Sequence, residues 1–249
     1  MNKDGQTKLV CFFDSGIGGL NLLYECAKRR KDCNFAYFAD NYNMPYGSLT
    51  HEKIKSLVDD KFQMMNYMNP AAAVVACNTV TAECINFLRQ KYSFPIIGIQ
   101  PAVKPAASNH KNCAVLATPA TANSQSLKNL VKEHGGGHTN VIPCPDLAAY
   151  IENNIFNLDR KEVERLLPRL ECDSIVLGCT HYIYIEEVIS SFYNCPVFDG
   201  IEGTANRFEQ IIGKCDFLSD HSEVTFFGGD CMKNSRVFNC LSNYNKTNV

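Results

Sequence analysis

Short apolar runs alternate with amphipathic stretches along the whole chain. The runs with the length of buried strands are residues 8–13, 35–39, 72–76, 95–99, 113–117, 139–143, 174–178, 196–199 and 223–228. Helical spacing lies between them, near residues 18–30, 50–67, 78–91, 121–134, 145–168, 182–191 and 202–213, with a last helix after 228. Continuous β-branched runs separated by helices are typical of parallel strands covered on both faces. The pattern therefore predicts an α/β fold.

Small, polar or reactive residues stand directly after many of these runs. In open α/β sheets, ligands bind beyond the carboxyl ends of the strands, so these positions are where chemistry is expected. The clusters are DSGIGG (14–19), DNYNMPYG (40–47), CNTVTA (77–82), TPATANS (118–124) and CTHY (179–182).

Two of these strand ends resemble each other. AVVACNT (73–79) and SIVLGCTH (174–181) share an apolar run, a small residue, a cysteine, and then hydroxyl and amide or imidazole side chains. Two similar halves, each giving one cysteine to a cleft between them, would explain the repetition. We therefore predict two similar parallel-sheet α/β lobes in a pseudo-two-fold relation, with the active site in the cleft.

Composition narrows the class of protein. The 249 residues are 45% hydrophobic and carry a net charge of −2, which indicates neither a nucleic-acid nor an anionic-membrane partner. No run approaches the ~20 apolar residues of a membrane helix, and the start of the chain lacks a signal-peptide pattern. The sequence therefore favours a cytoplasmic protein.

The 13 cysteines are many for such a chain. In the reducing cytosol they are expected to be free thiols, and no C-x-x-C pair points to a zinc ribbon or a thioredoxin-like site. Most are predicted to be small apolar core residues, among them Cys26, Cys33, Cys84 and Cys113. A metal site in the loop EHGGGH (133–138) is not favoured, and no metal is predicted.

Cys77 and Cys179 have a different context. A cysteine at a strand-to-helix turn meets unpaired backbone N–H groups that stabilise a thiolate. Two such thiols facing one carbon atom can remove a proton from one side and return it to the other, which inverts a stereocentre. Asp14 and His181 are candidate partners for the two thiols. Polar contacts to an amino-acid substrate are expected from Ser15, Asn78, Thr79 and Thr180.

Each candidate also has a structural interpretation. Asp14 could be the N-cap of the following helix, His181 a packing residue, and either cysteine a core residue. The glycine-rich turn could be a phosphate cradle, but it matches neither G-x-G-x-x-G nor the P-loop pattern.

Four blocks of the chain resemble one known family, the cofactor-independent glutamate racemases. They are FDSGIGGL (13–20), YFADNYNMPYG (37–47), VVACNT (74–79) and VLGCTHY (176–182). Their order and spacing agree with the family nearly end to end. Thr-His after the second cysteine resembles glutamate racemases rather than aspartate racemases, which tend to carry Thr-Glu.

The resemblance implies roles for individual residues. Cys77 would act on the D-isomer with help from Asp14, and Cys179 on the L-isomer with help from His181. Glu152 would be a further acid near the second thiol, although a helix-surface carboxylate remains an alternative. The matched substrate contacts are Asp14, Ser15, Tyr46, Gly47, Asn78, Thr79, Thr118, Thr121, Thr180 and His181.

The resemblance also implies a domain layout and a biological setting. The first lobe would comprise residues 1–98 and 207–249, and the second 99–206. The expected reaction is racemisation of glutamate, without pyridoxal phosphate or metal, to supply D-glutamate for peptidoglycan, often in a homodimer. Val80, Asn43 and Ile183 depart from the usual residues, which affects pocket detail more than reaction type.

Two other functions stay open at this point. One is a racemase of the same family for aspartate or a broader range of amino acids. The other, from a different class, is a non-catalytic thiol protein that acts as a redox sensor or metal binder.

Overall fold

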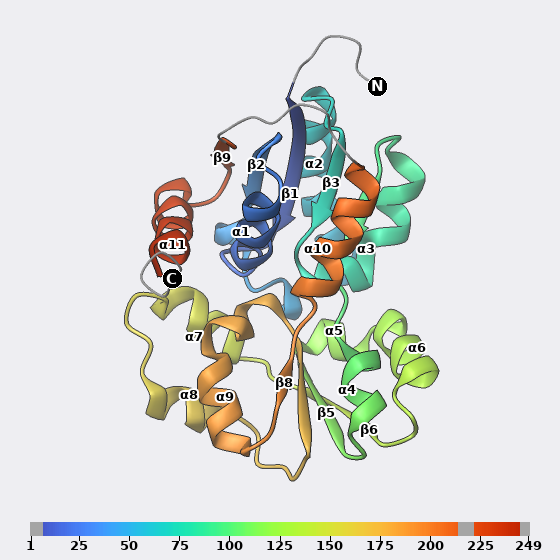
Figure 1. Ribbon diagram of the computed structural model, residues 1–249, viewed down its shortest axis with the longest axis vertical. Coiled ribbons are helices and arrows are strands. Elements are labelled where there is room, and N and C mark those ends of the chain that lie inside the picture. Colours follow the sequence, from blue (N-terminus) through green and yellow to red (C-terminus); the bar gives the residue numbers. More distant parts are fainter. Residues whose placement is uncertain (1–6, 214–221, 245–249) are drawn as a thin grey trace.

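Two parallel β-sheets, one in each half of the molecule, form the fold (Figure 1). The computed structural model describes residues 7–213 and 222–244. The first sheet has the order β4-β3-β1-β2-β9 and the second β6-β5-β7-β8, and the strand pairs are parallel. The strands are β1 (Lys8–Asp14), β2 (Cys33–Ala39), β3 (Ala72–Val75), β4 (Ile96–Gly98), β5 (Cys113–Ala117), β6 (Thr139–Pro143), β7 (Ser174–Gly178), β8 (Val197–Phe198) and β9 (Val224–Phe227). The predicted two-lobed α/β fold is confirmed.

Helices cover both sheets (Figure 1). Around the first sheet they are α1 (Leu20–Arg29), α2 (His51–Tyr67), α3 (Asn78–Lys91), α10 (Ile201–Ile212) and α11 (Cys231–Tyr244). Around the second sheet they are α4 (Val103–Asn109), α5 (Pro119–Asn123), α6 (Gln125–His134), α7 (Leu147–Asn154), α8 (Arg160–Leu166) and α9 (Glu186–Tyr193). Short 3₁₀ turns are η1 (Asn41–Asn43), η2 (Tyr46–Ser48) and η3 (Thr180–Ile185).

One predicted helix is divided in the structure. The helix expected over 121–134 is α5 and α6, because Ser124 has an extended backbone and its hydroxyl accepts from Leu127 N at 3.2 Å. The helices expected near 145–168 are α7 and α8, and Asp159 caps the second by accepting from Lys161 N at 2.8 Å. Side-chain caps of this kind start a new helix within a continuous apolar pattern. Helix α4 was not predicted.

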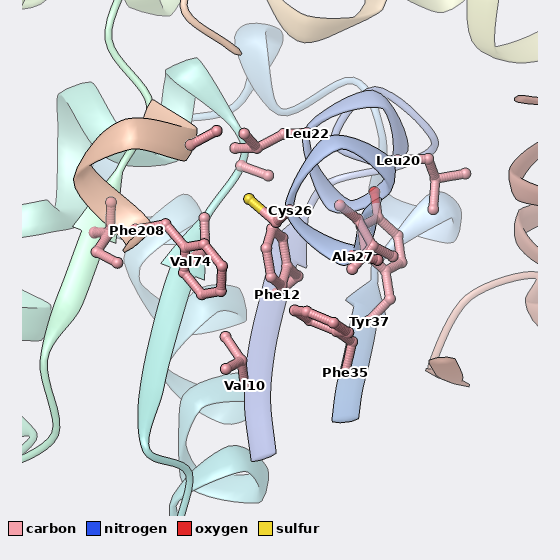
Figure 2. Close-up of a cluster of buried hydrophobic side chains, with 14 of the residues drawn as sticks. Val10, Phe12, Leu20, Leu22, Cys26, Ala27, Phe35, Tyr37, Val74 and Phe208 are labelled. Carbon is pink, nitrogen blue, oxygen red and sulfur yellow. The ribbon is translucent and has the colours of Figure 1, made fainter. Parts of the chain in front are cut away.

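An apolar cluster between the first sheet and helices α1 and α10 shows how the core is built (Figure 2). Phe12 packs edge-on against Phe35, with ring centroids 5.9 Å apart, and against Phe208 of α10 at 6.3 Å. Full burial of an aromatic ring of this size stabilises the fold by about 1.5–3 kcal/mol. Cys26 is buried in the same cluster, and Cys33, Cys84 and Cys113 are buried in cores as predicted.

The C-terminal part of the chain returns to the first sheet. Strand β9 pairs with β2, with Phe35 opposite Val224. Helix α10 crosses the predicted lobe boundary between 206 and 207, and its buried Phe208 belongs to the first sheet's cluster. The limits of the two lobes stay a prediction. Within the described ranges, no helix is long and apolar enough to span a membrane.

Candidate active site

The carboxyl ends of β1, β3, β5 and β7 meet at one narrow cavity between the two halves. Both cysteines of the repeated motif, Cys77 and Cys179, line it. The predicted contact residues that also line it are Ser15, Tyr46, Gly47, Asn78, Thr79, Thr118, Thr180 and His181. Two other predicted contacts, Asp14 and Thr121, are buried outside this lining. The strand-end clusters therefore come together, as the sequence predicts.

Cys77 is the residue before α3, at the end of β3, and its side chain is buried. Its Sγ lies 3.7 Å from the hydroxyl of Ser15. Burial and the nearby charge of Asp14 raise the pKa of the Cys77 thiol to about 12, although the N–H of Val80 and the Ser15 hydroxyl lower it. In the ligand-free protein Cys77 is therefore a protonated thiol at neutral pH, suited to donate a proton.

Cys179 precedes η3 and has a basic neighbour. Its Sγ lies 3.9 Å from Nδ1 of His181, whose other ring nitrogen, Nε2, lies 2.8 Å from Oε2 of Glu152. Burial alone would lower the pKa of His181, but the contacts with Cys179 and Glu152 raise it well above its usual value. The histidine is thus held as an imidazolium beside the sulfur of Cys179.

Glu152 of α7 has a full set of hydrogen-bond donors. Oε2 accepts from His181 and from the backbone N of Ile17 at 2.9 Å, while Oε1 accepts from Asn41 and Lys233, each at 2.8 Å. Burial would raise the pKa of Glu152, but His181 first, and then Lys233 and the N–H of Ile17, hold it well below its usual value. Only 3% of the residue is exposed, so the surface alternative is wrong.

Asp14 at the end of β1 is fully buried. Oδ1 accepts from the N of Gly16 at 2.7 Å, and Oδ2 accepts from the Thr180 hydroxyl at 3.2 Å, which joins the two halves. Burial raises the pKa of Asp14 to about 6, against the lowering effect of the His181 charge. Helix α1 instead begins after Gly19, so Asp14 is not its N-cap.

Three threonine hydroxyls form a cluster at the cavity, where Thr79 and Thr118 belong to the lining. Thr79 Oγ1 lies 3.0 Å from Thr118 Oγ1 and 3.1 Å from Thr121 Oγ1, and the last two lie 3.0 Å apart. Thr121 supports the other two from outside the lining. In the part of the chain that the structure describes, Oδ1 of Asn78 is buried and finds no hydrogen-bond partner. An unpaired buried acceptor in a cavity wall fits the ammonium group of an amino acid.

The two halves approach closely at the glycine-rich turn. A Cβ on Gly18 would overlap the hydroxyl of Thr180 and lie 2.7 Å from Nδ1 of His181. A side chain at this position would separate the loop from the residues that follow Cys179.

Several site residues were not found from the sequence. Asn41 stands in a recognised strand-end cluster, but nothing in the pattern indicated its bond to Glu152. No sequence pattern linked Lys233 to the site, because it lies on a helix far along the chain. Within 7–213 and 222–244, no group of three His, Cys, Asp or Glu side chains is arranged to hold a metal ion.

Known proteins share sequence with this chain over most of its length. Residues 36–207 match the family model of Asp/Glu/Hydantoin racemases. A glutamate racemase from Clostridium kluyveri is 36% identical over 89% of this chain and 90% of its own, and one from Clostridium perfringens is 37% identical over 88% and 89%.

Solved structures show the same relationship. The Escherichia coli glutamate racemase, in complex with L-glutamate and the activator UDP-MurNAc-Ala, has a TM-score of 0.82 at 25% identity, covering 96% of each chain. A Bacillus anthracis glutamate racemase isoform has a TM-score of 0.79 at 25% identity, covering 95% of this chain and 94% of its own. On the two-lobed fold, the paired strand-end cysteines and these matches, the chain belongs to the Asp/Glu/Hydantoin racemase family.

Proposed function

We propose that this protein interconverts L-glutamate and D-glutamate by proton transfer between the substrate and two thiols, Cys77 and Cys179. The observation that carries the proposal is that these cysteines, at the ends of corresponding strands in the two sheets, line one cavity. The curated relatives named above are glutamate racemases, which supports glutamate as the substrate.

In the L-to-D direction, Cys179 is the base. The His181 imidazolium favours its thiolate, which takes the α-proton of L-glutamate and breaks the Cα–H bond. The Cys77 thiol then gives its proton to the opposite face of the carbanion, forming D-glutamate and leaving a Cys77 thiolate. In the reverse direction Cys77 is the base and Cys179 the acid.

The carbanion needs stabilisation because an α-proton is only weakly acidic. Donors fixed around the carboxylate, where negative charge develops, lower this barrier most effectively. The hydroxyls of Thr79, Thr118 and Ser15 and the side chain of Asn78 are the proposed substrate contacts, together with Tyr46, Gly47 and Thr180. Tyr46 is held in place by donating to Oδ2 of Asp40 at 2.7 Å. Asp14 is proposed to assist Cys77, and Thr121 to support the other two threonines.

The test is a circular-dichroism assay of both glutamate enantiomers, beside both aspartate enantiomers. The wild-type protein should racemise glutamate, and in D₂O the product should carry deuterium at Cα. Cys77→Ser and Cys179→Ser should each reduce racemisation by about 10³-fold or more, because a serine hydroxyl is a far weaker acid than a thiol. Equal turnover of aspartate would indicate a broader racemase, and no turnover of either would reject the proposal.

Membership of the family supports a proposal for the biological setting. We propose that the product D-glutamate serves peptidoglycan synthesis, and that the protein acts in the cytoplasm as a homodimer. Size-exclusion chromatography with light scattering would test the homodimer, which a 27.8 kDa species at all concentrations would contradict.

A further inference from the structure

We propose that Lys233, on the C-terminal helix α11, is a positioning residue that holds Glu152 against His181 and so prepares Cys179 for proton transfer. This inference rests on the proposed racemase function and on Cys179 serving the L-enantiomer. It assigns a part in the reaction to a helix that contributes no residue to the lining of the cavity.

Lys233 holds Glu152 at two points. Its Nζ donates to Oε1 of Glu152 at 2.8 Å and also to the backbone carbonyl of the same residue. Asn41 donates to the same Oε1 at 2.8 Å. Oε2 is left for His181 and the backbone N of Ile17. With separate partners on each oxygen, the carboxylate plane is fixed and Oε2 faces His181.

The N-terminal turn of α11 is itself anchored. Asp230 accepts from Lys233 N at 2.9 Å, and its own N donates to Oδ1 of Asn41 at 3.0 Å. Asn234, on the same turn, donates to that oxygen at 3.2 Å. Asn41 therefore links the turn to Glu152. Figure 1 shows α11 beside α7, the helix that carries Glu152.

The contact crosses between the halves of the molecule. Lys233 follows β9 of the first sheet, whereas Glu152 and His181 belong to elements around the second sheet. The chain Lys233–Glu152–His181–Cys179 thus runs from α11 to the thiol without a break, over contacts of 2.8, 2.8 and 3.9 Å. If Lys233 loses its ammonium group, Oε1 keeps only Asn41, and the carboxylate is held less firmly against His181.

The experiment uses Lys233→Met, which keeps length and removes charge, and Lys233→Arg, which keeps charge. L- and D-glutamate are equally stable, so kcat/KM must be the same in both directions and cannot reveal which thiol is affected. Primary isotope effects on kcat/KM can reveal which thiol is affected. α-Deuterated L-glutamate reports the step at Cys179, and α-deuterated D-glutamate reports the step at Cys77.

Lys233→Met should lower kcat/KM by about 10-fold or more, as expected for a displaced catalytic group. The isotope effect should increase with α-deuterated L-glutamate and decrease with the D-enantiomer, since the step at Cys179 becomes slower. Lys233→Arg should restore most of the activity and the wild-type pair of isotope effects.

Arg236→Met is the matched control. Arg236 lies one turn further along α11 and stacks on Phe156 at 4.1 Å, so it also joins α11 to the segment after α7 without touching Glu152. This variant should keep wild-type kcat/KM and isotope effects. If it behaves like Lys233→Met, or if Lys233→Met leaves both isotope effects unchanged, the positioning role is rejected.

A measurement without substrate separates this result from the proposed function. In protein labelled with ¹⁵N-histidine, the Nε2 proton of His181 should give a hydrogen-bonded resonance in the wild type, in Lys233→Arg and in Arg236→Met. Lys233→Met should broaden or lose it. A protein that does not racemise glutamate but shows this pattern would reject only the function, whereas an unchanged resonance in Lys233→Met would reject the role of Lys233.

Discussion

The hydroxyl of Thr180 donates to the carboxylate of Asp14 across the two halves of the molecule, at 3.2 Å. Thr180 directly follows one cysteine of the cavity, and Asp14 is the carboxylate whose charge acts on the other. This one hydrogen bond therefore connects the surroundings of both thiols.

Replacement of Thr180 by valine should move the acid limb of the pH–rate profile. The hydroxyl bonds the ionised form of Asp14, so its loss should raise the carboxyl pKa above about 6, by about one unit. If the reaction needs Asp14 ionised, the acid limb of kcat/KM moves to higher pH. Thr180→Ser, which keeps the hydroxyl, should retain the wild-type profile, and an unchanged profile in Thr180→Val would contradict the role of Asp14.

Replacement of Gly18 by alanine should reduce activity much more than stability. Its Cβ would overlap Thr180 and press on His181, so the loop must move away from the cavity. We expect kcat/KM to fall by about 100-fold, the effect of a misplacement near 1 Å.

Gly203 of α10 provides the control, because a Cβ there meets open space. Gly203→Ala should leave activity unchanged and raise the free energy of unfolding by about 0.5–1 kcal/mol, since alanine favours the helix. Equal activity of the two glycine variants would show that the close approach at Gly18 does not matter for the reaction.

Asp14 should reduce the stability of the fold at neutral pH. Its folded pKa of about 6 exceeds the ordinary 3.8, so the folded state disfavours ionisation. The resulting loss of unfolding free energy is absent below pH 3.8, develops between pH 3.8 and 6, and is complete above pH 6. The difference, 6 − 3.8 = 2.2 units, corresponds to about 3 kcal/mol.

Asp14→Asn has nearly the same shape and can keep the bonds to Gly16 and Thr180. Urea unfolding should show it more stable than the wild type at pH 8, with most of this advantage gone near pH 4, while racemisation falls sharply. A variant less stable than the wild type at both pH values would contradict the assigned cost of the buried charge.

Two threonines of the cluster should differ in their effect on substrate binding. Thr79→Val removes a hydroxyl that lines the cavity and should raise KM for glutamate by about 10-fold, the effect of one lost hydrogen bond to a charged group. Thr121 lies outside the lining, so Thr121→Val should have a smaller effect on KM. If Thr121→Val raises KM as much as Thr79→Val, the two residues do not differ in this way.

Much of the fold and the cavity could be predicted from local patterns. The strands before Cys77 and Cys179 are short apolar runs ending in a small residue, and parallel strands bring their carboxyl ends to one edge of a sheet. The division at Ser124 was missed because a serine cap breaks a helix without changing the apolar spacing. The contact of Lys233 with Glu152 joins residues 81 apart, and it depends on where α11 packs.

The return of the chain to the first sheet has a consequence for the protein during its synthesis. The pairing of β2 with β9 can form only after β9 has been synthesised, because Phe35 pairs with Val224, which lies 224 − 35 = 189 residues later. At ordinary ribosomal speeds this interval is about 10–40 s. During this interval both cysteines are synthesised, because they precede Lys233 in the sequence. The contact between Lys233 and Glu152 cannot form until Lys233 has been synthesised. The nascent chain therefore carries both thiols before it carries the contact proposed to prepare one of them.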